Sequence, residues 1–109
     1  MNTATSNPIY ITDHAYDRAK ERLGWNKKTT ARMIERVVSQ GTPASEVKGL
    51  LSLWIKNRDG YTSTNTFVIY GNNLFIFAQN ILITIINIPS RASMQTILRK
   101  KNVNGFVEA

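Results

Sequence analysis

The stretch that decides the fold is TFVIYGNNLFIFAQNILITII, residues 66–86. It holds three runs dense in β-branched and aromatic side chains, which fit the pleated surface of a strand. Gly-Asn-Asn at 71–73 and Gln-Asn at 79–80 separate the runs, and both are typical turn sequences. The pattern predicts an antiparallel meander with strands at 66–70, 74–78 and 81–86, joined by tight hairpins.

Two helical patterns precede the meander. Thr12 predicts the N-cap of a helix over residues 13–23, which Gly24 ends. A second helix is predicted over residues 28–40, and we expect a left-handed cap at Gly41.

A third apolar pattern follows Thr42-Pro43 and predicts a helix that reaches Ile55. Residues 51–55 also tolerate an extended conformation, so a strand there stays open. Residues 57–60 have turn composition.

At the carboxyl end, Ser90 predicts the cap of a short basic helix that carries Met94 and Leu98 on one side. We expect residues 1–8 and 102–109 to be flexible. The chain is then one α+β domain, residues 1–109, with two or three amino-terminal helices packed on an antiparallel β-sheet meander. We expect the opposite face of the sheet to be left for a ligand.

Composition narrows the function classes. Fourteen basic residues against seven acidic ones give a net charge of +7, and such a field attracts phosphate backbones. RNA is therefore the expected partner, with DNA or a host nucleoprotein as alternatives.

Cysteine is absent, which excludes disulfides, and no metal or cofactor motif is present. Without a signal-like or membrane-spanning run, we expect a cytoplasmic protein that makes no membrane contact.

The basic residues are unevenly placed. The excess begins after the first predicted helix and is densest near the carboxyl end. A scattered, merely solubilising charge is the alternative interpretation. The residues that we expect to contact nucleic acid are Lys27, Lys28, Arg32, Arg36, Tyr70, Arg91, Arg99, Lys100 and Lys101.

The first helix carries the candidate chemistry. His14, Arg18 and Arg22 stand four residues apart, which places them along nearly one helix face. Guanidinium groups bind phosphate oxygens, and an imidazole can move a proton at neutral pH. Thr84 is the one hydroxyl inside an aliphatic strand, where alternation predicts that it shares a face with Leu82 and Ile86. These residues suit metal-independent RNA cleavage, in which the 2′-hydroxyl attacks phosphorus.

Each of these residues also has an ordinary structural interpretation. Arg18 and Arg22 would form weak ion pairs with Asp17 and Glu21 on a surface helix. Threonine is common in strands, and a strand tyrosine such as Tyr70 more often packs in the core or at its rim.

The arrangement ITDHAxxRxxxRLG at residues 11–24, a second helix, then YGxxLFIF at 70–77 and LIT at 82–84 resembles small proteins of phages and mobile elements. These are members of the barnase, EndoU, colicin and RelE superfamily of ribonucleases. The resemblance implies two helices on a four-stranded antiparallel sheet and RNA cleavage without metal. It also implies roles for His14, Arg18, Arg22 and Thr84.

Three hypotheses stay open at this point. The first is a metal-independent, toxin-like endoribonuclease. The second is a non-catalytic protein that binds nucleic acid or a host nucleoprotein, for example to inhibit a defence complex, with a cognate immunity or host protein as a further partner. The third is an interaction module whose exposed β edge pairs with a partner strand.

Overall fold

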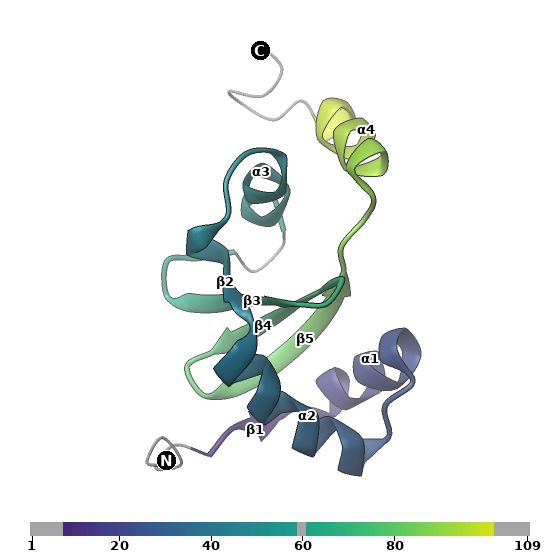
Figure 1. Cartoon of the computed structure of the whole chain (residues 1–109), viewed down its shortest axis with the longest axis vertical. Helices are drawn as coiled ribbons and strands as arrows, with labels where there is room; N and C mark the ends of the chain where they lie inside the picture. Colours follow the sequence, from purple (N-terminus) through teal and green to yellow (C-terminus); the bar gives the residue numbers. More distant parts are fainter. Residues whose placement is uncertain (1–7, 59–60, 102–109) are drawn as a thin grey trace.

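The computed structural model describes residues 8–58 and 61–101, and only the backbone of Lys100 and Lys101. The flexibility expected for residues 1–7 and 102–109, and the second half of the turn expected at 57–60, lie outside the described residues. Within the described residues, four α-helices and a mixed sheet form the α+β fold that the sequence predicts (Figure 1).

The predicted meander is confirmed and forms the centre of the sheet. Its strands are β3 (Asn65–Tyr70), β4 (Asn73–Ala78) and β5 (Ile81–Asn87), paired antiparallel. Two-residue turns join them, and both need a left-handed residue: Gly71 has φ +62° and Gln79 has φ +58°. For Gln79 this conformation is strained, because its Cβ approaches the following carbonyl.

Two short strands extend the meander to the order β1-β5-β4-β3-β2. Strand β1 (Tyr10–Ile11) runs parallel to β5, and β2 (Thr42–Pro43) runs antiparallel to β3. The sheet is therefore mixed. Residues Thr42 and Pro43 were expected to open a helix, and they instead occupy the outer edge, where proline is tolerated because it need not donate to a neighbour.

The first two helices cover one face of the sheet. Helix α1 (Asp13–Leu23) has the predicted bounds, with Thr12 as N-cap and Gly24 as a left-handed C-cap at φ +71°. Helix α2 (Lys27–Gln40) is capped by Asn26, whose side chain accepts from Thr29 N. Helix α1 lies against β5 and α2 against β3. The buried residues of this first core are Ala15, Ala19, Ile34, Val37, Val68, Phe75, Phe77, Leu82 and Ile85.

The opposite face is also covered, which corrects the expectation of an open ligand-binding face. Helices α3 (Leu50–Lys56) and α4 (Arg91–Lys101) pack there. The buried residues of this second core are Trp54, Ile55, Phe67, Leu74, Ile76, Met94 and Leu98. The cause lies in β4, whose apolar side chains alternate between the two cores, so both of its faces need burial.

Two local expectations are also wrong. Gly41 is not a left-handed cap, since its φ is −70°; a side chain there would collide with Val68 and the Val37 carbonyl oxygen, so close approach of α2 to β3 selects glycine. The third helix is interrupted: a short 3-10 turn η2 (Ala44–Glu46) precedes α3, whose N-cap Gly49 has φ +74°. Residues 51–55 are helical, so the strand alternative for them is wrong.

Candidate nucleic-acid interface

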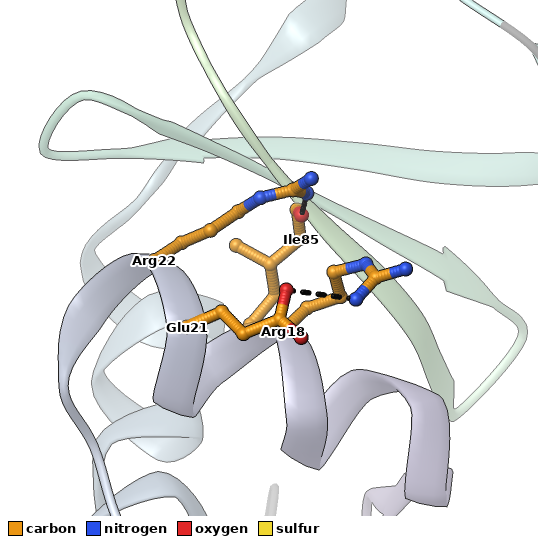
Figure 2. Close-up of polar contacts among 4 residues, drawn as sticks. All are labelled: Arg18, Glu21, Arg22 and Ile85. Carbon is orange, nitrogen blue, oxygen red and sulfur yellow. Dashed lines mark hydrogen bonds and ion pairs between the residues drawn. The ribbon is translucent and has the colours of Figure 1, made fainter.

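Helix α1 is fastened to β5 at both of its ends. At the start, the Thr12 hydroxyl accepts a hydrogen bond from Ala15 N at 3.0 Å and donates to the Leu82 carbonyl at 3.2 Å. At the end, Arg22 Nη1 donates to the Ile85 carbonyl (Figure 2). In the described part of the chain, strand β1 pairs with Ile81 and Leu82 of β5, and Arg22 donates to a carbonyl farther along β5. One N–H donor of Arg22 thus holds α1 against β5.

The other two predicted residues of α1 differ in their surroundings. His14 is exposed, and within the described part of the chain no hydrogen bond or ion pair engages it. The Arg18 side chain is 29% exposed and pairs with Glu21, with Nη1 2.9 Å from Oε1. Figure 2 shows the guanidinium of Arg18 turned to Glu21 and that of Arg22 extended to β5. An exposed pair of this kind contributes roughly 0.2–1 kcal/mol, so phosphate could displace Glu21.

Thr84 does not join these residues, which corrects the expected four-residue site. Ile76 pairs with Thr84 but Phe77 pairs with Leu82, so Ile83 is an extra residue in β5, a bulge. Paired residues share a face, and Ile76 belongs to the second core. Thr84 therefore lies on the α3–α4 side of the sheet, with Ile86 but not with Leu82, and away from α1.

Helix α2 presents a row of cations on the same side of the sheet as α1. Lys28, Arg32 and Arg36 are exposed, and their spacing of four residues places them along one face. No ion pair engages these three side chains among the described residues. Lys27 differs, because its ammonium lies 5.4 Å above the ring of Tyr16, a cation–π contact that links α2 to α1.

Tyr70, also expected at the interface, packs against the first core and is half-buried. Asn80, in the turn before β5, has a structural role: Nδ2 donates to the Pro8 carbonyl at 2.8 Å, and the Asn80 carbonyl accepts from Tyr10 N at 2.8 Å. These bonds hold β1 beside the β4–β5 turn.

The carboxyl-terminal basic residues lie across the sheet from α2. The predicted helix is confirmed as α4, and Ser93 N donates to the Ser90 hydroxyl at 3.2 Å as a cap. Arg91 and Arg99 are exposed, while Lys100 and Lys101 belong to the same helix. Met94 and Leu98 fix α4 on the second core. The basic residues thus lie on both sides of the sheet. A short duplex bound to one side does not contact the basic residues of the other side.

The sequence predicted Lys28, Arg32 and Arg36 as nucleic-acid contacts, but their alignment along one face of α2 was missed. These three cations have the same four-residue spacing as His14, Arg18 and Arg22, so the row could have been predicted from the sequence. Within residues 8–58 and 61–101 there is no group of three His, Cys, Asp or Glu side chains that could hold a metal ion. The helices of this part of the chain are too short or too polar to cross a membrane.

No protein-family model, curated protein or solved structure matches this chain. The resemblance to the ribonuclease superfamily therefore stays a prediction from the sequence.

Proposed function

We propose that the chain is an RNA-binding domain that contacts the phosphate backbone through α2 and the adjoining face of α1. The observation that carries the proposal is the row Lys28, Arg32 and Arg36, three exposed cations along one helix face without an ion pair among the described residues. A cation that is already in an ion pair must break that pair before it binds phosphate, which lowers its net contribution to binding. These three are available to phosphate.

The geometry of the row suits a polyanion. At a rise of 1.5 Å per residue, Lys28 and Arg36 lie about 12 Å apart along the helix axis, a span that covers several consecutive phosphates of a duplex. Two of the three residues are arginines, which bind phosphate bidentately. Arg18 on α1 adds a guanidinium on the same side of the sheet, held only by its exposed pair with Glu21.

A binding titration tests this proposal. A fluorescently labelled RNA duplex of 12 base pairs is titrated with the wild type and with the triple variant Lys28→Ala, Arg32→Ala, Arg36→Ala. We expect the triple variant to bind at least tenfold more weakly. The matched control is Arg91→Ala with Arg99→Ala, which removes two exposed arginines from the other side of the sheet and should bind like the wild type. Equal affinity of the triple variant and the wild type would refute the proposal, and a duplex DNA of the same length shows whether the surface prefers RNA.

A second candidate function, metal-independent RNA cleavage, is favoured by one observation. His14 is exposed and unengaged in the described part of the chain, one helical turn from Arg18. His14 would transfer a proton and Arg18 would stabilise charge on the phosphoryl oxygens. Thr84 has no part in this version of the site, because it lies across the sheet.

Incubation of purified protein with total RNA in EDTA tests the second candidate. We expect His14→Ala to abolish cutting and Arg18→Ala to lower it, whereas Thr84→Val leaves it unchanged. Intact RNA with the wild type, or equal cutting by His14→Ala, would leave binding as the function of this face.

A further inference from the structure

A cleft of 490 Å³ opens at the β2–β3 end of the molecule, away from α1 and α2. Its described walls come from three stretches of the chain. They are Pro43, Ala44, Ser45 and Val47 on one side, Ser52, Ile55 and Lys56 of α3 on another, and Tyr61, Thr62, Ser63, Asn65, Thr66 and Phe67 on the third. None of the residues of α1 or α2 lines it. A volume of this size is typical of pockets that hold small organic ligands.

The polar part of the described wall consists of hydroxyl groups, the carboxamide of Asn65 and one cation. Ser45, Ser52, Ser63 and Thr66 line the cleft, and Lys56 is the one charged residue among the described residues that line it. No carboxylate belongs to this described wall. Hydroxyls and an ammonium together supply donors for phosphate oxygens and both donors and acceptors for sugar hydroxyls or base edges. The wall therefore favours an anionic, hydrogen-bonding ligand.

The apolar part of the wall is aromatic and aliphatic. Ile55 and Phe67 form buried surface at 1% and 5% exposure. Tyr61 is 41% exposed, and its ring centroid lies 5.1 Å from that of Phe67 at an angle of 51°. The ring of Tyr61 thus presents an accessible face beside a buried one. Planar bases stack on such faces.

We propose that this cleft binds a nucleotide unit, with the base stacked on Tyr61 above the floor formed by Phe67 and Ile55, and the phosphate at Lys56. The shared chemistry is a planar base joined to a phosphorylated ribose. Such a unit comes either from a free nucleoside monophosphate or from an unpaired nucleotide of a single strand. This proposal does not depend on the function proposed for α2, because the two surfaces share no residue.

One hydroxyl of the cleft wall already has hydrogen-bond partners. The Thr62 hydroxyl accepts from Thr64 N at 3.3 Å and Asn65 N at 3.1 Å, which holds the approach to β3. Ser52, by contrast, is half-buried on α3 and lines the cleft. Replacing it with leucine fills part of the cleft, whereas Lys56→Ala removes the ammonium group together with its aliphatic chain and fills nothing.

Calorimetric titration of the full chain with AMP, UMP, GMP and CMP tests the proposal. We expect saturable binding of at least one nucleotide, weakened about tenfold or more by Lys56→Ala, since a charged hydrogen bond is lost. The corresponding nucleoside should bind the wild type and Lys56→Ala equally. Ser52→Leu should abolish binding of both. The matched control is Lys48→Ala, an exposed lysine outside the cleft, which should behave like the wild type.

Several results would overturn the proposal: no saturable binding by any of the four nucleotides, binding that survives both Ser52→Leu and Lys56→Ala, or ribose 5-phosphate that binds as tightly as the nucleotide. If Ser52→Leu alters the circular dichroism spectrum, Ser45→Phe at an exposed lining position replaces it. A tetranucleotide that binds more tightly than the monophosphate identifies a single strand as the source. The triple variant of α2 should retain nucleotide binding, so failure of one proposal leaves the other testable.

Discussion

The salt dependence of RNA binding measures how many phosphates the three cations of α2 neutralise. Each phosphate neutralised on a duplex contributes about 0.9 to the slope of log affinity against log salt concentration. If Lys28, Arg32 and Arg36 each neutralise one phosphate, alanine at all three lowers that slope by about 2.7. Between 50 and 200 mM salt the wild type should therefore lose roughly 40-fold more affinity than the triple variant. All three side chains are exposed, so the fold should be unaffected.

Fluorescence anisotropy with the labelled RNA duplex at five salt concentrations measures both slopes. Arg91→Ala with Arg99→Ala provides the control, whose slope should equal that of the wild type because α4 lies across the sheet. If the triple variant keeps the wild-type slope, the row on α2 does not contact phosphate. If the control variant loses the slope instead, the interface is on α4.

Three further predictions concern the fold that presents this face. Gly41→Ala should destabilise the protein by roughly 1–3 kcal/mol, because its methyl group would collide with Val68; chemical denaturation measures this, and an unchanged midpoint would contradict the close approach of α2 to β3. Thr12→Ala should cost about 1 kcal/mol through loss of the α1 cap, with Thr12→Ser as the control that restores it. Gln79→Gly should stabilise the protein by roughly 1 kcal/mol, because glycine adopts the positive φ without strain, and a lower melting temperature would argue against that turn geometry.

The elements with strong local signals were predictable from the sequence. Helix α1 has an N-cap and a glycine stop within its own sequence, and the three meander strands are separated by turn residues, so neighbours in the chain decide both. Strand β1 was missed because two residues carry no periodicity. Its place depends on β5, about 70 residues away, through bonds such as Tyr10 N to the Asn80 carbonyl.

The burial of the second sheet face could also have been predicted from the sequence of β4, although an open face was expected. Leu74-Phe-Ile-Phe77 contains no polar position, whereas a strand with one solvated face would alternate. The bulge at Ile83 is different in kind. Strict alternation predicts Thr84 beside Leu82, and nothing in residues 81–86 marks the extra residue. It is fixed by pairing with β4 and by the Thr12 hydroxyl, which reaches the carbonyls of Leu82 and Ile83.

In the candidate site too, the placement of residues on one helix could be predicted from the sequence, whereas contacts between elements could not. Spacing on one helix predicted that His14, Arg18 and Arg22 share a face, and the structure keeps all three on α1. Spacing could not predict that Arg22 donates to the Ile85 carbonyl, since that contact joins two elements. Nor could it predict the cleft, whose described walls come from three separate stretches between residues 43 and 67.

Chemical-shift mapping tests the central claim most directly. The ¹⁵N-labelled protein is titrated with an unlabelled RNA duplex, whose paired bases do not enter the nucleotide cleft. We expect the largest amide shifts in α2 from residue 28 to 36 and in the adjoining turns of α1, with α4 unchanged. Shifts confined to α4, or no shifts at saturating RNA, would contradict it.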